Sequence, residues 1–373
     1  MNEKKLQVAK PVLVAATLTA IVWVGAGSLT PPAGPIAPTM KTLTEVEPRI
    51  AVNATNTPGD ADSLFKITQP GSYYLTGNIT GVSGEMGIEI AASGVTVDLM
   101  GFDLVGVPGS LDAIRVSVGA NNIGVVSGSV RNWAQDGVDL ASTTNTRLAD
   151  LLVAGNTGHG IVAGSYSVIT RCAAYFNEND GIGTGSGSEI INCLAHNNTG
   201  SGLRVNDRST ITDCTVSSNT SNGITTDIGC TISNCTTYGN TGNGIRTSSS
   251  CTITNCTAYS NTGDGINFNQ YCIVRNNTCA VNGVLSGDGA GIHATFSDNR
   301  IEGNNCTNND RGMDVDVAGN FIARNTCSGN TTNWDVAAGN VCLVVSAATS
   351  AAILGDTGGV APGSTDPNAN FTY

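Results

Sequence analysis

Short apolar stretches recur along the chain, and each begins with a small residue, usually glycine, followed by an aliphatic one. Between Gly160 and Gly265 the step is constant, with a repeat of about 21 residues. The series extends with looser spacing to Gly87 on one side and to a degenerate position at Trp334 on the other. Its members are Gly87-Ile88, Ala113-Ile114, Gly137-Val138, Gly160-Ile161, Gly181-Ile182, Gly202-Leu203, Gly223-Ile224, Gly244-Ile245, Gly265-Ile266, Gly291-Ile292, Gly312-Met313 and Trp334. Such regular self-similarity predicts a solenoid of about a dozen stacked units.

The unit from Gly244 to Asp264 shows what each repeat forms. Apolar and polar residues alternate over short stretches, and no stretch has helical spacing, so each unit is predicted to be three short strands joined by turns. One coil buries little apolar surface alone, whereas coils stacked about 4.8 Å apart share a continuous core. The predicted inward residues are Ile245, Cys251, Ile253, Cys256 and Ala258. The predicted outward residues are Arg246, Thr252, Thr254, Thr257 and Tyr259.

Asparagine recurs in step with the repeat at two places. One series is Asn177, Asn198, Asn219, Asn240 and Asn261, and the other is Asn192, Asp213, Asn234 and Asn255. Asn side chains bond backbone groups, stack as amide ladders and tolerate left-handed backbone geometry. Both series are therefore predicted to be structural turn positions.

The run Asn-Thr-Gly-Asn-Gly-Ile at 240–245, repeated as Asn-Thr-Gly-Asp-Gly-Ile at 261–266, resembles the right-handed parallel β-helix repeat of pectate-lyase-like proteins. The segment at 72–79, Ser-Tyr-Tyr-Leu-Thr-Gly-Asn-Ile, resembles the lead-in strand of many secreted β-helix proteins. The resemblance covers about residues 87–345 and matches no specific enzyme family. It implies an all-β, right-handed parallel β-helix of about twelve three-stranded coils with N- and C-terminal capping segments. The family includes lyases, hydrolases, epimerases and adhesins, so the fold leaves the function open.

The segments outside the repeat suggest export. Basic residues before an apolar run at 12–26 have the layout of a signal peptide, predicted to span 1–26, although an uncleaved membrane anchor is the alternative. Residues 27–40 then form a Pro-rich linker, 41–86 an N-terminal cap, 87–345 the β-helix, and 346–373 a C-terminal cap or tail. This layout predicts a secreted, extracellular or cell-surface protein without stable membrane insertion after cleavage.

Composition narrows the choice of partner. The chain has 47 Gly, 12% charged and 5% aromatic residues, so small side chains must fill the core. Cleavage after residue 26 removes three lysines and one glutamate, which leaves 14 basic and 28 acidic residues. An acidic protein is unsuited to nucleic acid and to polyanionic glycans unless a cation bridges them. A neutral glycan, another protein or a metal-bridged acid fits better, and the oligomeric state is not indicated.

Cysteines form two columns with the step of the repeat. Cys172, Cys193, Cys214, Cys235 and Cys256 make the first, and Cys230, Cys251 and Cys272 make the second. The spacing resembles no zinc motif. Both columns are predicted to face the core, where free thiols act as small apolar side chains, although disulfides between the columns remain an alternative.

Titratable residues gather just before the glycine in consecutive repeats. Asp112, Asp136, His159 and Asp180 occupy this position, and Asp139 adjoins them. These five residues could supply an acid and a base for glycosidic chemistry, or carboxylates for Ca²⁺. Asp before Gly is also ordinary turn chemistry. Gly158-His159-Gly160 is similar to a polygalacturonase motif, but the rest of that signature is absent, and no metal site is assigned.

Two outward rows are candidate ligand-binding surfaces. Tyr175, His196, Tyr238 and Tyr259 share one position, with Ser217 between them, and a row of rings suits sugar stacking or strengthens the sheet. Arg204 and Arg246 share a second position, with no acidic set clearly beside them. The hydroxyls of Thr210, Thr212, Thr231, Ser233, Thr252 and Thr254 form a small array like those of ice-binding solenoids.

These patterns support one leading hypothesis and two alternatives. The leading one is a non-catalytic structural or glycan-binding surface protein, because the repeat is regular and holds no complete catalytic set. The first alternative is a polysaccharide-active lyase, glycoside hydrolase or epimerase centred on the five titratable residues. Ice binding is a minor alternative.

Overall fold

The computed structural model describes residues 48–117, 119–283, 289–347 and 364–373. Arg49–Tyr373 form one compact unit. The predicted signal peptide and Pro-rich linker lie outside the described residues. No helix among the described residues is both long and apolar enough to cross a membrane.

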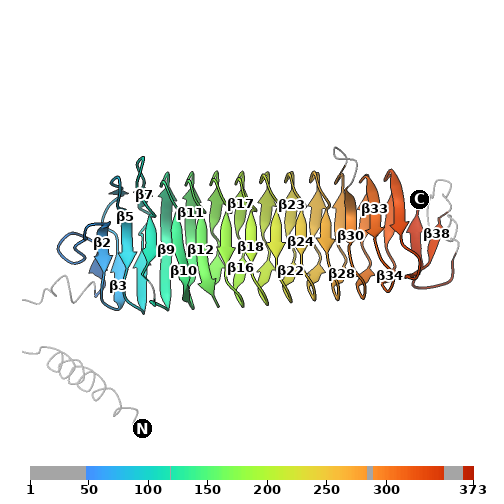
Figure 1. The fold of residues 1–373 in the computed structure, drawn as a ribbon, viewed down its shortest axis with the longest axis horizontal. Coiled ribbons are helices and arrows are strands. Elements are labelled where there is room, and N and C mark those ends of the chain that lie inside the picture. The colour runs from blue at the N-terminus through green and yellow to red at the C-terminus, as the bar shows by residue number, and fades with distance from the viewer. Residues whose placement is uncertain (1–47, 118, 284–288, 348–363) are drawn as a thin grey trace, which may run out of the picture. The chain divides into compact units, whose positions relative to one another are not determined.

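The described residues form a stack of coils held together by parallel strand pairing, as Figure 1 shows. Sheet 1 contains thirteen described strands, one from each coil. These are β2 (Ser63–Ile67), β5 (Met86–Ile90), β8 (Ile114–Val116), β10 (Val138–Thr144), β12 (Ile161–Ser165), β15 (Ile182–Thr184), β18 (Leu203–Val205), β21 (Ile224–Thr226), β24 (Ile245–Thr247), β27 (Ile266–Phe268), β30 (Ala290–Ala294), β33 (Arg311–Val315) and β36 (Thr332–Val336).

Sheet 2 contains twenty-six described strands, which run as two ladders joined through the long strands β9 (Ile123–Arg131) and β11 (Arg147–Ala154). The first ladder also contains β1 (Ile50–Ala51), β3 (Gly71–Tyr74), β6 (Val95–Asp98), β13 (Val168–Thr170), β16 (Glu189–Ile191), β19 (Thr210–Thr212), β22 (Thr231–Ser233), β25 (Thr252–Thr254), β28 (Ile273–Arg275), β31 (Arg300–Glu302), β34 (Phe321–Ala323) and β37 (Val341–Cys342). The second ladder also contains β4 (Ile79–Thr80), β7 (Asp103–Val105), β14 (Ala173–Tyr175), β17 (Leu194–His196), β20 (Thr215–Ser217), β23 (Thr236–Tyr238), β26 (Thr257–Tyr259), β29 (Thr278–Ala280), β32 (Asn305–Thr307), β35 (Thr326–Ser328), β38 (Val344–Ser346) and β39 (Asn370–Thr372).

The predicted parallel β-helix is confirmed, with one coil more than the twelve that the glycine pairs indicate. The additional coil begins at β2, which pairs in parallel with β5. This strand lies within residues 41–86, the segment predicted from the sequence to be an N-terminal cap. Its strand carries Phe65 where later coils carry the aliphatic residue of the pair, so the glycine pattern does not reveal it. At the other end, β39 pairs with β35 and with β38, so the last residues of the chain extend sheet 2.

The inward and outward assignments of the Gly244–Asp264 unit are confirmed. Ile245, Cys251, Ile253, Cys256 and Ala258 are all buried, at 1% exposure or less. The outward side chains range from partly buried to exposed. Equivalent aliphatic residues stack from coil to coil, which gives one continuous core along the unit.

The glycine of each pair is explained by a close approach of the backbone. A Cβ atom on Gly160 would lie 2.5 Å from the carbonyl oxygen of Gly181 and 2.7 Å from Nδ2 of Asn177. Gly244 meets the same two kinds of atom, at 2.6 Å from the Gly265 oxygen and 2.7 Å from Nδ2 of Asn261. A side chain at this position would therefore clash with both the next coil and the asparagine ladder.

The two asparagine series have different structural roles. In the first, the Asn198 side chain donates to Oδ1 of Asn219 at 3.0 Å, and the Asn219 side chain donates to Oδ1 of Asn240 at 2.9 Å. These amides are buried and form a ladder along one corner of the coils. In the second, Asn192, Asp213, Asn234 and Asn255 have φ between 53° and 57°. Both structural predictions are confirmed, the first as an amide ladder and the second as left-handed turns.

The twelve cysteines, all within the described residues, are free thiols, and eleven of them are buried. The two predicted columns face the core, and Cys279, Cys306 and Cys327 form a third in the second ladder. The Cys193 amide donates to Sγ of Cys214 at 3.4 Å, whereas the Cys256 amide donates to Oδ1 of Asn277 at 2.8 Å. Cysteine and asparagine thus accept the same kind of backbone hydrogen bond in one column.

Candidate functional site

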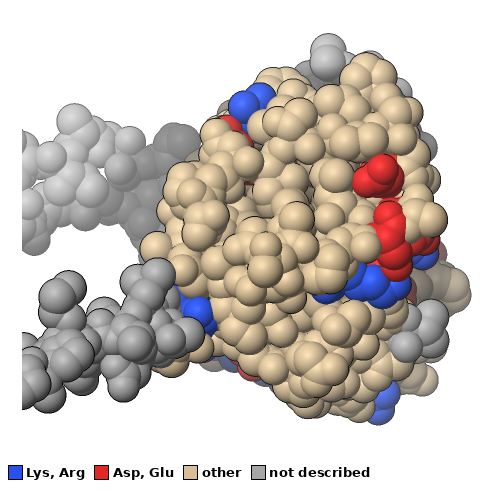
Figure 2. Space-filling model, turned by 90° about the vertical axis from the view of Figure 1, so that its left-hand side faces the viewer, with Lys and Arg blue, Asp and Glu red and all other residues tan. Residues whose placement is uncertain are grey.

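Charged residues concentrate on one outward position of sheet 1, which we call the outer stripe. Each member pairs with the equivalent residue of the next coil. The outer stripe consists of Lys66, Glu89, Arg115, Asp139, Val162, Gly183, Arg204, Thr225, Arg246, Asn267, His293, Asp314 and Asp335. Viewed from the end that carries β2 and β3, the surface is mostly uncharged, and its charged side chains form small groups (Figure 2).

The residues just before each glycine, which we call the pre-glycine column, hold the backbone of the next coil. Oδ1 of Asp112 accepts the amide of Asp136 at 2.8 Å, and Oδ1 of Asp136 accepts the amide of His159 at 2.6 Å. Asn222 and Asn243 accept the equivalent bonds in later coils. The column is therefore built by turn chemistry, and each carboxylate has only one oxygen left for anything else.

The N-terminal part of the predicted catalytic set surrounds Arg115. Its guanidinium lies 3.3 Å from Oδ2 of Asp112 and 3.8 Å from Oδ2 of Asp139. Asp112, Asp136 and Asp139 line a hollow of about 330 Å³ with Arg115. Burial, together with the nearby carboxylates of Asp136 and Asp139, raises the pKa of Asp112 to about 6, although the Asp136 amide opposes this. Burial also raises the pKa of Asp136.

The remaining two predicted residues, His159 and Asp180, belong to a second hollow of about 420 Å³. Within the described part of the chain, Nδ1 of His159 is buried without a hydrogen-bond partner and lies 4.0 Å from Oδ2 of Asp180. The same carboxylate oxygen accepts from Nε of Arg204 at 2.6 Å. The sequence showed no acidic set clearly beside the two arginines, and the structure places one carboxylate there, because Asp180 reaches Arg204 from the preceding coil. The structure thus brings the five residues into two adjoining groups, and their catalytic role stays a prediction.

Arg246 borders a third hollow, of about 300 Å³, together with Arg204, Thr225 and Asn269. Arg204 and Arg246 occupy the same outward position two coils apart, as the sequence predicts. Among the described residues, Arg246 has no ion pair or hydrogen bond from its side chain, whereas Arg204 is tied to Asp180. The three hollows follow one another along the outer stripe.

The aromatic row lies on sheet 2, in the second ladder, and its register is as predicted. Tyr175 and His196 stack with centroids 5.0 Å apart, and Tyr238 and Tyr259 stack at the same distance. Ser217 separates the two pairs. Because the rings face each other along the stack, these faces are engaged within the sheet, and sugar stacking on the row stays a prediction.

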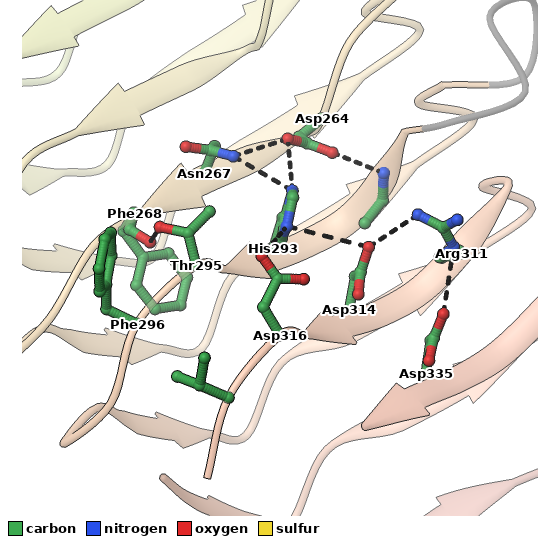
Figure 3. Close-up of polar contacts among 12 residues, drawn as sticks. Asp264, Asn267, Phe268, His293, Thr295, Phe296, Arg311, Asp314, Asp316 and Asp335 are labelled. Carbon is green, nitrogen blue, oxygen red and sulfur yellow. Dashed lines mark hydrogen bonds and ion pairs between the residues drawn. The ribbon is translucent and has the colours of Figure 1, made fainter. Parts of the chain in front are cut away.

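A cluster of titratable side chains that the sequence reading missed surrounds His293, as Figure 3 shows. Nδ1 of His293 lies 3.0 Å from Oδ2 of Asp264, and Nε2 lies 3.3 Å from Oδ2 of Asp316 and 3.9 Å from Oδ2 of Asp314. Although burial alone would lower it, the hydrogen bond to Asp264 and the three carboxylates raise the pKa of His293 to about 9.

Neighbouring residues hold this cluster in place. Oδ1 of Asp264 accepts from the backbone amide of Ala290 at 2.7 Å, and the side-chain Nδ2 of Asn267 donates to Oδ2 of Asp264 at 2.8 Å. Arg311 bonds Oδ2 of Asp314 at 2.8 Å and lies 3.4 Å from Oδ2 of Asp335. Figure 3 shows carboxylates converging on the imidazole from the coil before it, which carries Asp264, and from the coil after it, which carries Asp314 and Asp316.

The family of this chain follows from its match to a model of a known protein family. The model of the right-handed β-helix region matches residues 87–227 and 225–354. The chain belongs to this family. A search of curated proteins gives no match.

Among solved structures, this right-handed β-helix protein is similar to the A-module of mannuronan C-5 epimerase AlgE4 from Azotobacter vinelandii. The two share 17% identity with a TM-score of 0.55, over 70% of this chain and 88% of that one. It is also similar to ORF18 of Geobacillus virus E2, with 13% identity and a TM-score of 0.51, over 80% of this chain and 64% of that one. At these identities the similarity shows the shared fold alone.

The His293 cluster escaped the sequence reading because the repeat lengthens just before it. The step from Gly265 to Gly291 is longer than the constant step that ends at Gly265. One more constant step along the Arg204–Arg246 position leads to Asn267, and the longer step then leads to His293, which Asp314 and Asp335 follow. The repeat register of this right-handed β-helix protein, once the longer step is allowed for, would therefore have predicted that His293 and Asp314 lie side by side.

Proposed function

We propose that this right-handed β-helix protein binds a polysaccharide along the outer stripe of sheet 1, centred on His159, Asp180 and Arg204. The observation that supports this proposal is the succession of three hollows along one face. A polymer of similar units suits a row of neighbouring hollows better than a single small ligand does. Export, predicted from residues 1–26, would expose this face to extracellular or cell-surface glycans.

The central hollow has the chemistry that a sugar ring requires. Val162 and Gly183 are consecutive members of the outer stripe, so its floor is apolar and lacks a side chain at one position. Asp180 offers carboxylate oxygens, Arg204 offers N–H donors, and Asn206 offers both donor and acceptor groups. Because Asp180 and Arg204 neutralise each other, a neutral, hydroxyl-rich glycan fits this hollow better than a polyanion.

Turnover of the glycan is the second candidate function. Its support is the position of Asp136, a carboxyl with a raised pKa, directly before His159 in the pre-glycine column. A carboxyl whose pKa is raised by burial is better suited to act as a general acid than an ordinary aspartate is. Ice binding on the threonine array of sheet 2 stays a minor alternative, which a thermal-hysteresis measurement would test.

Filling the central hollow gives the sharpest test of binding. A Cβ on Gly183 would meet no atom closer than the Ile161 oxygen at 3.9 Å, and no positive φ is required there, so Gly183→Val should fold normally. The purified protein would be screened by affinity electrophoresis against neutral and acidic polysaccharides, with and without Ca²⁺. We expect Gly183→Val to weaken binding of the recognised glycan at least tenfold.

Thr231→Val, an outward replacement in sheet 2, is the matched control and should bind like the unmodified protein. Equal binding by Gly183→Val, or no binding to any glycan by the unmodified protein, would overturn the proposal. New reducing ends or unsaturated sugars in the same incubations would establish turnover. The hypothesis of a polysaccharide-active enzyme would then replace that of a non-catalytic glycan-binding protein.

A further inference from the structure

We propose that His293, Asp314 and Asp316 form a binding site for one divalent transition-metal ion of the Zn²⁺ or Mn²⁺ class. The site is separate from the three hollows described above and does not depend on glycan binding. Its candidate ligand atoms are Nε2 of the imidazole and one oxygen of each carboxylate. These three atoms lie within 4.8 Å of one another.

Asp264 orients the imidazole for this role. Its Oδ1 is fixed by the Ala290 amide, and its Oδ2 faces Nδ1 of His293 at 3.0 Å. A metal ion would displace the proton of Nε2, while the proton on Nδ1 donates to the Asp264 carboxylate. The Nε2 lone pair that is released faces Asp314 and Asp316 (Figure 3). In metalloproteins, a histidine that binds metal through one ring nitrogen commonly donates its other N–H to a carboxylate in this way.

The charge balance around the imidazole favours a cation. The carboxylates of Asp264, Asp314 and Asp316 surround His293. A fourth carboxylate, that of Asp335, lies beside Arg311, which pairs with Asp314 and Asp335. Even with a protonated imidazole, the four carboxylates outnumber the cationic groups of Arg311 and His293, so the group carries excess negative charge around a partly buried centre. A divalent ion between Nε2 and the two carboxylates would offset this charge, and solvent or substrate could complete its coordination beside the exposed Asp316.

A second acidic group in the protein provides the contrast. Asp60, Asp62 and Glu89 also bring three carboxylates together. There, however, Nζ of Lys66 already lies 2.6 Å from Asp60 and 2.8 Å from Glu89, so an ammonium group occupies the place of a cation. The His293 group offers a nitrogen ligand as well as oxygens. Imidazole suits Zn²⁺ and carboxylate oxygens suit Mn²⁺, so a mixed nitrogen and oxygen set fits these ions, whereas Ca²⁺ takes oxygen ligands.

The test measures metal binding by the full chain after chelator treatment and thiol reduction. Zn²⁺ and Mn²⁺ would be titrated by calorimetry, and Co²⁺ would be followed by its visible absorption bands. We expect one ion per chain and at least tenfold weaker binding in both His293→Gln and Asp316→Asn. Asp316 is half-exposed and lies just after β33, so its replacement should leave the fold intact, and circular dichroism would verify this.

His196→Gln and Asp60→Asn are the matched controls, and both should bind the metal as the unmodified chain does. Unchanged affinity in His293→Gln or Asp316→Asn would overturn the proposal. So would tighter binding of Ca²⁺ than of Zn²⁺, or the absence of stoichiometric binding. A cobalt–thiolate charge-transfer band in the near ultraviolet would assign the ion to the cysteine columns and would equally contradict this site.

Discussion

At the scale of single residues, the pre-glycine column shows that one structural task can be met by different side chains. The column needs an oxygen that accepts the amide of the next coil, and Asp112, Asp136, Asn222 and Asn243 all provide it. A carboxylate performs this task at a greater desolvation cost than an amide does. Because asparagine would suffice for the structural task, an aspartate at this position is a candidate for a functional role that needs its charge.

Asp112→Asn tests this cost through pH dependence. The folded-state pKa of Asp112 is raised to about 6 from an ordinary value near 3.8, mainly by burial. The folded protein therefore binds this proton more tightly than the unfolded chain does, and the stability contributed by the protonated form is lost as pH rises from about 4 through 6. Asn keeps the acceptor for the Asp136 amide and does not titrate.

We therefore expect the stability of Asp112→Asn relative to the unmodified protein to improve by about 2 kcal/mol between pH 4 and pH 7.5. Urea denaturation at several pH values measures this difference. A difference that is independent of pH, or that changes in the opposite direction, would show that Asp112 is not a buried carboxyl with a raised pKa.

The Asp180–Arg204 pair permits a second prediction, with a matched control on the same chain. Asp180 is 6% exposed, so Arg204→Ala leaves a buried carboxylate whose one remaining hydrogen-bond donor among the described residues is the Ser201 amide. We expect a loss of about 1–3 kcal/mol in unfolding free energy. Arg171 and Asp150 form an exposed pair with two contacts of 2.7 Å, and Arg171→Ala should cost less than about 1 kcal/mol.

Chemical denaturation of the two variants at neutral pH makes this comparison. Equal losses would mean that Asp180 is as well solvated as Asp150 and that the central hollow is open water rather than a partly desolvated site.

At the scale of elements, the corners of each coil determine how regularly the strands can stack. One corner is filled by a buried asparagine in coil after coil, and a neighbouring corner changes from cysteine to asparagine after Cys256. Periodicity alone predicted both asparagine series and both cysteine columns. It could not predict that cysteine and asparagine accept the same bond, because this equivalence depends on the position of the next coil's amide.

Asn219→Gly and Asn234→Gly separate the two asparagine roles with one type of substitution. The Asn219 side chain donates to the Ala195 carbonyl and to Asn240, and accepts from Asn198, all within the core. Its loss should cost about 3–5 kcal/mol, because several buried polar groups lose partners. Asn234 has φ of 55°, which glycine adopts readily, so that variant should remain within about 1 kcal/mol of the original.

Denaturation midpoints of the two variants provide the readout. Similar losses at both positions would contradict the assignment of Asn219 to a buried amide ladder and Asn234 to a turn.

At the scale of the whole β-helix, the fold was predictable and the site was only partly so. A repeat as short as this one can bury its apolar positions only by stacking, which accounts for the success of the fold prediction. Contacts between side chains of neighbouring coils, such as Asp180 with Arg204, join residues more than one repeat apart and depend on how far each side chain leans along the stack. The His293 cluster was not predicted for a simpler reason. The coil before Gly291 is longer than the coils just before it, so a constant repeat length no longer aligns the residues that follow it.

Hydroxyl-radical footprinting of the protein with and without its bound glycan tests the central claim, that sheet 1 carries the binding face, most directly. Mass spectrometry can follow oxidation of His159 in the central hollow and of Tyr175, His196, Tyr238 and Tyr259 on sheet 2 in the same experiment. Binding along the outer stripe predicts that the glycan protects His159 and leaves the four aromatic residues of sheet 2 unchanged. Protection of Tyr238 and Tyr259 with no change at His159 would contradict it and would assign binding to the aromatic row.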